Sequence, residues 1–219
     1  PSPLTVTFSS TGVVTIPTAG NGSPYPSSFV VPSLGGNIVG LTVSLNGLSH
    51  TSPQDIDMLL VGPTGADSII MSDVGGTFPI VGVNLTLADA AANSLPVGAQ
   101  IFSGTYKPTN NLPGDFFPPP APPASGNSLL SVFNGTNPAG VWRLFVTDFW
   151  SGEEGTLEGW SLHITLNCDD GNPCTTDSCD PVLGCLHTAT NCDDGNACTV
   201  DSCDPAAGCV HDAAAANGF

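Results

Sequence analysis

In the first 166 residues, short stretches in which apolar and polar residues alternate with a period of two are separated by polar segments. Between Trp160 and Leu166, for example, every second residue is large and apolar, and the residues between them are polar. Because neighbouring side chains of a strand point to opposite faces of a sheet, this alternation predicts strands that are buried on one face. Alternation or short apolar runs predict strands at Leu4–Phe8, Val13–Ile16, Phe29–Val31, Ile38–Leu45, Ile56–Val61, Ser68–Ser72, Val81–Leu87, Leu129–Phe133, Val141–Thr147 and Thr156–Leu166.

The segments between these strands are rich in Gly, Pro, Ser and Asn, which favour turns. Helical periodicity is absent apart from a possible turn at Ala88–Ser94. Residues 104–127 form a long irregular segment, and we expect its run PPPAPPA to be polyproline-like and docked on the sheet surface. Short strands at this spacing predict an all-β protein built as a β-sandwich or jelly roll.

A different pattern begins at residue 168, where a unit of 24 residues is repeated once. All eight cysteines lie in these two units, and each unit ends in Cys-x-His. They are Cys168, Cys174, Cys179 and Cys185 in the first unit and Cys192, Cys198, Cys203 and Cys209 in the second. An even number of regularly spaced cysteines predicts disulfides and an extracellular compartment. We therefore interpret the chain as a secreted, cell-surface or extracellular protein whose leader has been removed.

Four cysteines in one unit allow three connectivities if each unit pairs within itself. We expect Cys168–Cys179, Cys174–Cys185, Cys192–Cys203 and Cys198–Cys209, in units with little regular secondary structure. Zinc is the alternative, because Cys-x-His occurs twice, but the units have no CxxC pair. A unit of 24 residues cannot bury an adequate core, so each disulfide is expected to contribute about 2–4 kcal/mol to stability.

The net charge of the chain excludes some classes of binding partner. The chain has two basic and 19 acidic residues, with a formal net charge of −17. Nucleic acid is excluded as a partner because phosphate binding needs Lys and Arg. No apolar run approaches the roughly 18 residues that a membrane helix needs, so membrane insertion is not expected. Bound Ca²⁺ would offset the repulsion among the carboxylates.

Separated motifs in residues 16–166 resemble a known module. They include SPYPSSFVVPSLGGNIVGLTVSLNGLSH, DIDMLLVGPTGADSIIMSDVGG and NPAGVWRLFVTDFWSGEEGTLEGWSLHIT. This part of the chain resembles the bacterial P-domain-like (proprotein convertase P/homo B) module. The resemblance implies a jelly-roll-like β-sandwich with calcium sites, which is not itself catalytic and which follows a subtilisin-like catalytic domain in proteases. The 24-residue units resemble the CDDGNxCTxDxC repeats of secreted and cell-surface proteins.

The chain therefore divides into four predicted segments. Residues 1–15 form an extended strand segment outside the recognised module, and residues 16–167 form the sandwich. Residues 168–191 are the first Cys-rich repeat, and residues 192–219 are the second repeat and a tail. The first segment either pairs within its own sandwich or adds a strand to a neighbouring molecule.

Asp55 and Asp57 flank one strand residue, so their carboxylates point to the same side and repel unless a proton or cation lies between them. The resemblance to the P-domain places two further acidic positions near the same end of the sandwich. The predicted Ca²⁺ ligands of the sandwich are drawn from Asp55, Asp57, Asp73, Asp89 and Asp115. The alternative is that these are ordinary solvated turn residues.

Each repeat also crowds carboxylate and amide oxygens around a glycine, as other Ca²⁺ loops do, but without the complete EF-hand pattern. The predicted ligands are Asp169, Asp170, Asn172 and Asp177 in the first repeat and Asp193, Asp194, Asn196 and Asp201 in the second. The alternative is a set of Asx-turns that cap a disulfide-bonded loop.

The sequence contains no G-x-S-x-G elbow, no H-E-x-x-H helix and no Walker loop, so we expect no enzymatic activity. Asn21, Asn84 and Asn134 lie in N-x-S/T sequons and are possible glycan sites.

Two functions remain. In the first, the chain is a calcium-stabilised, non-catalytic subunit of an extracellular filament or surface assembly. Head-to-tail self-association by strand addition then forms a homopolymer. In the second, it is an accessory or adhesion module, or a C-terminal fragment of a secreted subtilisin-like protease or other hydrolase.

Overall fold

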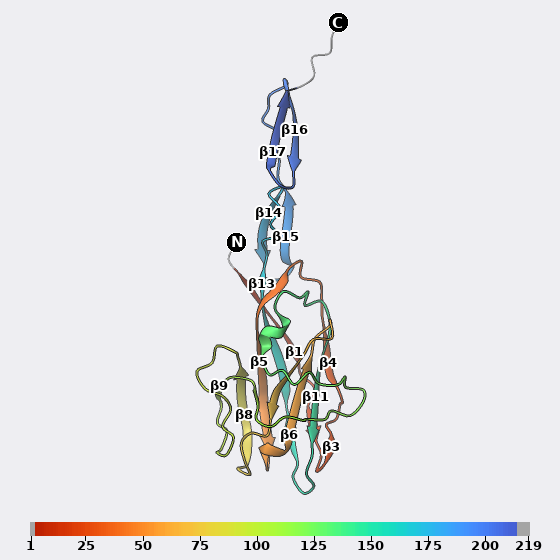
Figure 1. Ribbon diagram of the computed structural model, residues 1–219, viewed down its shortest axis with the longest axis vertical. Coiled ribbons are helices and arrows are strands. Elements are labelled where there is room, and N and C mark those ends of the chain that lie inside the picture. The colour runs from red at the N-terminus through yellow and green to blue at the C-terminus, as the bar shows by residue number, and fades with distance from the viewer. Residues whose placement is uncertain (1–2, 214–219) are drawn as a thin grey trace.

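The computed structural model describes residues 3–213, and its strands form two facing sheets and two separate hairpins (Figure 1). In the first sheet the order is β1-β13-β5-β12-β2, with β8 beside β5 and β9 beside β8. Its strands are β1 (Leu4–Ser10), β2 (Val14–Ile16), β5 (Asn37–His50), β8 (Ile80–Leu87), β9 (Gly104–Tyr106), β12 (Gly155–Leu157) and β13 (Gly159–Asn167).

The second sheet has the order β10-β7-β6-β11-β3, with β4 also beside β11. Its strands are β3 (Gly20–Asn21), β4 (Ser27–Val31), β6 (Ile56–Val61), β7 (Asp67–Ser72), β10 (Thr109–Asn110) and β11 (Gly140–Asp148). Two short 3₁₀ helices, η1 (Pro53–Asp55) and η2 (Leu130–Phe133), complete the sandwich. The protein is thus all-β, as predicted.

The core lies between the two sheets and is filled by fully buried side chains, the largest of which include Trp142 and Trp160. Every residue of β6 and β7 is buried, which a sheet exposed on one face would not allow. The proline-rich segment explains this, because Phe117 packs on the outer face of these strands in a second apolar cluster. Tyr25 fixes the segment by donating a hydrogen bond to the carbonyl of Pro118 (3.0 Å). The predicted docking of this segment is confirmed.

Most predicted strands are present with small shifts in their ends, and two predictions need correction. Leu129–Phe133, predicted as a strand, contains the 3₁₀ helix η2, whose first amide groups are capped by a side chain distant in sequence. Thr156–Leu166 is not one strand, because Glu158 separates β12 from β13. The stretch Ala88–Ser94 forms turns and bends without a helix.

β1 is an edge strand of its own sandwich, and this corrects the interpretation of residues 1–15 as a segment outside the module. Leu4 to Ser10 pair in antiparallel register with Leu166 to Trp160 of β13. On the outer face, polar side chains join the two strands. These pairs are Thr5–Thr165, Thr7–His163 and Ser9–Ser161, each at 2.9 Å. Pairing within the chain was the alternative that the sequence left open.

The repeats are β-hairpins, which corrects the expectation of little regular structure. The first hairpin is β14 (Thr175–Asp180) with β15 (Gly184–Ala189), and the second is β16 (Thr199–Asp204) with β17 (Gly208–Ala213). Figure 1 shows them stacked end to end as a stalk that continues from β13. The register of each hairpin places its third and fourth cysteines directly opposite each other.

The disulfide connectivity differs from the predicted one. Cys168 bonds to Cys185 and Cys192 to Cys209, so the first and fourth cysteines pair within each repeat. Cys174 bonds to Cys203, so the second cysteine of the first repeat pairs with the third cysteine of the second. The prediction was wrong because it treated each repeat as a closed unit, whereas the stacked hairpins share a bond. Disulfides are nevertheless confirmed for Cys168, Cys174, Cys185, Cys192, Cys203 and Cys209.

Candidate metal centre and the junction with the first repeat

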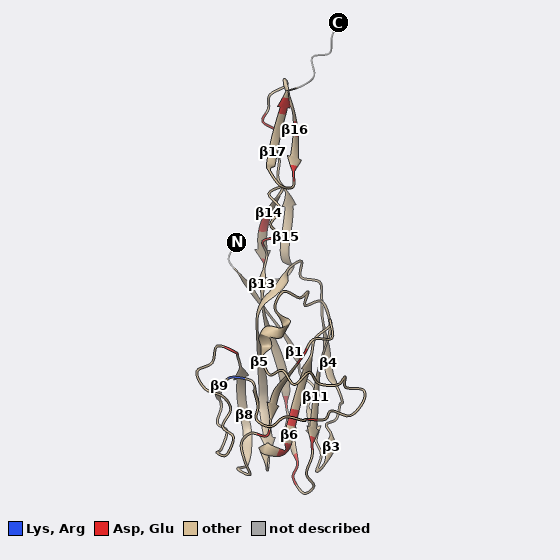
Figure 2. Cartoon of the chain, viewed as in Figure 1, with Lys and Arg blue, Asp and Glu red and all other residues tan. Residues whose placement is uncertain are grey.

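An acidic cavity of about 310 Å³ lies at the end of the sandwich that faces away from the stalk. It opens where η1, the turn after β7, the segment around Asp115 and the loop after β11 meet. Figure 2 shows acidic residues at this end of the sandwich, near the start of β6. The lining residues include four carboxylates, those of Asp55, Asp57, Asp73 and Asp115.

Three of these carboxylates converge. Asp57, Asp73 and Asp115 each place one oxygen within 4.8 Å of the others, although they come from three separate parts of the chain. Ser72 donates hydrogen bonds to Asp115 (2.8 Å) and Asp73 (3.1 Å) and so holds two of them together. Asp73 has a φ of 55°, the left-handed backbone that Asp tolerates better than most residues.

The cluster lacks a compensating positive charge in the described part of the chain. The pKa of Asp57 is raised to about 7, mainly by burial and in part by the neighbouring carboxylates of Asp115 and Asp73. Burial also raises the pKa of Asp73, with Asp115 adding to the effect. The buried Oδ2 of Asp115 has no hydrogen-bond partner among the described residues. A buried carboxylate oxygen without a donor is costly unless a cation or proton binds it.

These features fit a hard divalent cation such as Ca²⁺, which takes carboxylate oxygens. Asp57, Asp73 and Asp115 would hold the ion, and Asp55 lines the same cavity. Asp89 is not part of the cluster. Its two oxygens accept hydrogen bonds from the amides of Leu130 (2.9 Å) and Ser131 (2.8 Å), so it caps η2 instead. Of the five predicted ligands, the structure brings four to one cavity.

Exposed apolar side chains surround the acidic cavity. Trp150 is 69% exposed, and it lines the cavity together with Phe116, Leu112 and Phe149, which are also exposed. Large exposed aromatic residues that gather in one place often mark an interaction surface. The sequence analysis missed this rim because its residues lie in two loops that meet only in the fold.

A buried pair beside the cavity joins the two sheets. His50, at the end of β5, donates from Nε2 to Asp148 Oδ2 at the end of β11 (2.9 Å), and both side chains are fully buried. His50 Nδ1 accepts from the amide of Ser52 (3.2 Å), and Asp148 Oδ1 accepts from the amide of Trp150 (2.9 Å). With both ring nitrogens and both carboxylate oxygens used, this pair is structural.

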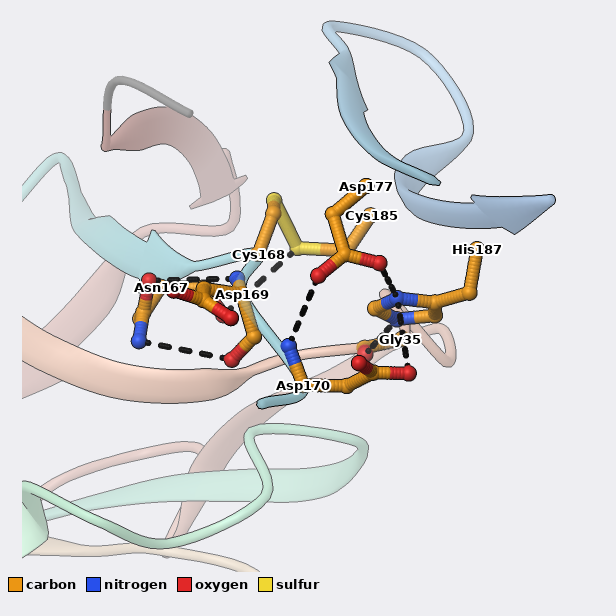
Figure 3. The surroundings of a disulfide bond; sticks show 8 residues. All are labelled: Gly35, Asn167, Cys168, Asp169, Asp170, Asp177, Cys185 and His187. Carbon is orange, nitrogen blue, oxygen red and sulfur yellow. Dashed lines mark hydrogen bonds and ion pairs between the residues drawn. A yellow bond between two sulfur atoms is a disulfide. The ribbon is translucent and has the colours of Figure 1, made fainter. Parts of the chain in front are cut away.

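The junction between sandwich and stalk is closely packed (Figure 3). Cys168 and Cys185 are buried, and their disulfide belongs to the apolar core. The amide of Cys185 donates to the carbonyl of Leu34 (2.6 Å). A Cβ on Gly184 would collide with the backbone of Leu34, so only glycine allows this approach.

His187 links the first repeat to the sandwich. Its Nδ1 lies 2.8 Å from Asp177 Oδ1 and 3.4 Å from Asp170 Oδ2, while Nε2 lies 3.0 Å from the carbonyl of Gly35 (Figure 3). Both ring nitrogens face oxygen acceptors, so these contacts favour the ring with a proton on each nitrogen. They raise the pKa of His187, Asp177 having the largest effect and Gly35 the next. The hydrogen bond from His187 in turn lowers the pKa of Asp177.

The second repeat reproduces the same cluster. His211 Nδ1 lies 2.8 Å from Asp201 and 3.6 Å from Asp194, and Asp201 raises the pKa of His211. The histidines were not among the predicted site residues. The 24-residue spacing of Cys-x-His was the signal that could have indicated them.

Most of the predicted Ca²⁺ ligands of the repeats accept hydrogen bonds within their own loops. Asp169, Asp170 and Asn172 each accept from the amide two residues later, at 2.8–3.0 Å. Asp193, Asp194 and Asn196 do the same in the second repeat. These are the Asx-turns of the alternative interpretation. Calcium binding by these loops stays a prediction.

The sequons lie in the sandwich. Asn84 and Asn134 are exposed, whereas Asn21 is half-buried in β3. Glycan attachment at these sites also stays a prediction. Among residues 3–213, no helix is long and apolar enough to cross a membrane.

No curated protein matches the chain. Among solved structures, the chain is similar to the Aeromonas sobria serine protease in complex with the chaperone ORF2 (16% identity, TM-score 0.39) and to the serine protease of Aeromonas sobria (16% identity, TM-score 0.36). Both matches cover 76% of this chain but only 27% and 28% of the protease chains, so this chain spans about a quarter of their length.

Family models divide the chain where the fold does. The Dictyostelium (slime mold) repeat matches residues 167–190 and 191–212, which are the two stacked hairpins. The proprotein convertase P-domain matches residues 122–164, which include β11, β12 and most of β13. Both families are non-catalytic modules. The chain therefore combines a β-sandwich that carries a proprotein convertase P-domain match with two hairpins that each match the slime mold repeat.

Proposed function

We propose that the chain is an accessory module of a secreted hydrolase, in which a calcium-stabilised sandwich docks on its partner and the disulfide-bonded repeats form a stalk. The observation that carries this proposal is the acidic cavity with its rim of exposed aromatic residues, at the pole opposite the stalk. The P-domain match supports it, because P-domains accompany proteases.

Calcium has a defined role in this proposal. The three converging carboxylates repel one another, and one of them is buried while the other two are half-buried. The cation would remove that repulsion and fix the loops that carry the aromatic rim. Asp57 lies on β6, Asp73 on the turn after β7 and Asp115 in the long loop. Binding would therefore hold the long loop against the strands and present Phe116 and Trp150 in one arrangement.

The calcium part is tested by thermal unfolding with Ca²⁺ and with a chelator. An ion that binds only the folded state raises the midpoint by mass action. We expect the increase to be lost in Asp57→Asn and kept in Asp89→Asn, since Asp89 caps η2 outside the cluster. The control variant can start from a lower midpoint, but its response to Ca²⁺ should match that of the parent chain. An increase that survives in Asp57→Asn would place the ion elsewhere.

The accessory role is tested on material from the native source. An antibody against residues 168–213 should recover the chain together with a hydrolase domain, either in one polypeptide or in a complex that survives size-exclusion chromatography. Hydrolase activity should elute in the same fractions, and Trp150→Ser should weaken a non-covalent complex. Recovery of a 22.1 kDa chain without any hydrolase would overturn the proposal.

Head-to-tail self-association is the competing proposal, and the same material distinguishes it. Strand addition would require β1 to leave β13, with which it makes seven residue pairs and three polar side-chain contacts. Negative-stain microscopy in the presence of Ca²⁺ would show linear polymers if strand addition occurs, and single particles if the chain is an accessory module.

A further inference from the structure

Each repeat has a buried glycine at the start of its second strand, and that glycine faces the unit before it. In the first repeat, Gly184 is buried against the backbone of Leu34 in the sandwich. In the second, the equivalent Gly208 is buried, and a Cβ there would lie 3.6 Å from the Cβ of Pro173 in the first repeat. Each repeat thus uses the start of its second strand to dock on the preceding unit.

The first repeat shows which surface of a repeat binds the repeat that follows it. Pro173 lies next to Gly208, since a Cβ added to Gly208 would be 3.6 Å from the Cβ of Pro173, and Cys174 bonds to Cys203 of the second repeat. The amide of Thr190, in the linker, donates to the carbonyl of Cys174 (2.8 Å) and fixes the connection between the repeats.

The second repeat carries the same surface. Ala197 occupies the position of Pro173 and also has a Cβ atom, and Cys198 occupies the position of Cys174. Asn172 and Cys174 are half-buried beneath the second repeat, whereas the equivalent Asn196 and Cys198 are exposed. Within the described residues, Cys198 is a free thiol.

We propose that Ala197 and Cys198 form a docking surface for a further repeat of this 24-residue pattern, joined by a disulfide between Cys198 and the third cysteine of that repeat. The continuity of the existing interface supports this choice of partner, because Ala197 and Cys198 stand at the repeat positions of Pro173 and Cys174, next to which the second repeat is bound. A second copy of this chain does not offer the same surface. Its first repeat is docked on the sandwich through Gly184, and its Cys203 is already bonded.

The bond forms by thiol–disulfide exchange with a small disulfide oxidant, for which oxidised glutathione is the probe. The Cys198 thiolate attacks one sulfur of the oxidant and releases one glutathione thiol. The third cysteine of the added repeat, as thiolate, then attacks the Cys198 sulfur of the mixed disulfide and releases the second thiol. Two cysteine thiols are oxidised, and one disulfide is reduced to two thiols.

The test compares the parent chain with a chain lengthened by one more copy of the 24-residue unit, both folded in a glutathione buffer. Cysteines are mapped by alkylation and mass spectrometry under non-reducing conditions. In the parent chain, Cys198 should be alkylated or glutathionylated. In the lengthened chain, we expect Cys198 to be protected and its peptide to be linked to the third cysteine of the added unit.

The matched control replaces that third cysteine with serine in the lengthened chain and should make Cys198 reactive again. Protection of Cys198 in this control would show that the partner is wrong. Three results in the lengthened chain would also overturn the proposal. These are a Cys198 that is still alkylated, a Cys198 that is still bound to glutathione, and a disulfide that joins the Cys198 residues of two chains. Circular dichroism of the lengthened chain and its control verifies that both are folded.

Discussion

Asp57 illustrates how single residues determine the behaviour of the candidate metal centre. Its side chain is only 5% exposed, and the carboxylates of Asp73 and Asp115 lie beside it. A proton or a cation relieves the resulting cost, and these two ligands compete for one place. The pKa of about 7 means that this competition falls in the neutral pH range.

Without metal, the stability of the protein should fall as pH rises because of Asp57. Its pKa is higher in the folded state (about 7) than the ordinary value of 3.8, so its stabilising contribution is complete below pH 3.8 and is lost as pH rises through 7. At roughly 1.4 kcal/mol per pKa unit, the loss is on the order of 4 kcal/mol. Urea unfolding in chelator at pH 5 and pH 8 measures the part of this loss that falls above pH 5, which is about 3 kcal/mol.

The contribution of Asp57 is isolated by comparing the parent chain with Asp57→Asn. The variant should lose less stability between the two pH values, and Ca²⁺ should flatten the profile of the parent chain. Equal pH profiles for the two proteins in chelator would show that Asp57 is not perturbed.

His50 and Asp148 form a second interaction that depends on single residues. Asp148→Ala should lower the free energy of unfolding by about 3–5 kcal/mol, because it leaves the His50 Nε2–H and the Trp150 amide without acceptors inside the protein. Chemical denaturation measures the change. Asp212→Ala, on the exposed face of β17, serves as the control and should change stability by less than about 0.5 kcal/mol. A similar small change in Asp148→Ala would contradict a structural role for the pair.

At the scale of elements, the junction between the sandwich and β15 is held by close backbone packing. Gly184 lies against Leu34, and the amide of Cys185 donates to the carbonyl of Leu34. The Cys168–Cys185 disulfide extends the apolar core into the stalk. The stalk therefore leaves the sandwich from a packed base.

Gly184→Ala should loosen this base more than Gly208→Ala loosens the contact between the repeats. Both glycines have a positive φ, 87° and 85°, so each alanine adds a similar backbone cost of roughly 1–2 kcal/mol. Only at Gly184 does the new Cβ collide with backbone. Hydrogen exchange of the Cys185 amide should accelerate in Gly184→Ala and stay unchanged in Gly208→Ala. Equal exchange in both variants would mean that the junction is not tightly packed.

The histidine clusters of the hairpins give a pH dependence of opposite sign to that of an ordinary carboxylate. The pKa of His187 is raised, so its contribution to the junction is complete below its ordinary value of 6.5 and is lost as pH rises through the higher folded value. NMR titration should show both His187 and His211 with midpoints above 6.5. Asp177→Asn should move the midpoint of His187 back toward 6.5 and leave His211 unchanged. A shift of both midpoints would contradict two independent clusters.

On the scale of the whole molecule, the chain has two different poles. The acidic cavity with its exposed aromatic rim lies at one end, and the stacked repeats extend from the other (Figures 1 and 2). This arrangement leaves the cavity accessible while the stalk points away from it. β1 spans the sandwich between the poles and completes its first sheet.

Removal of β1 should destabilise the sandwich. A chain that begins at Thr11 loses the buried Val6 and the seven pairs with β13, so its thermal midpoint should fall. A synthetic peptide of residues 3–10 should restore part of the loss by adding back the strand. Size-exclusion chromatography with light scattering should show the intact chain as a monomer. A shortened chain with unchanged stability would contradict pairing within the chain.

Local patterns in the sequence were enough to predict the strands, the sandwich, the division at Cys168 and the presence of disulfides. Period-two alternation reports which residues of a strand are buried, and cysteine spacing reports covalent bonding, since both are local properties. The carboxylates of Asp57, Asp73 and Asp115 were also among the predicted ligands. The i, i+2 spacing with Asp55 indicated Asp57, and the resemblance to the P-domain indicated Asp73.

Only the tertiary structure decided which residues meet. Asp89 and Asp115 look alike in sequence, yet one caps η2 and the other enters the cavity, because long-range packing places each loop. The pairing of β1 depends on contacts more than 150 residues away. The Cys174–Cys203 bond depends on how one hairpin stacks on the next, which no pattern within a single repeat contains.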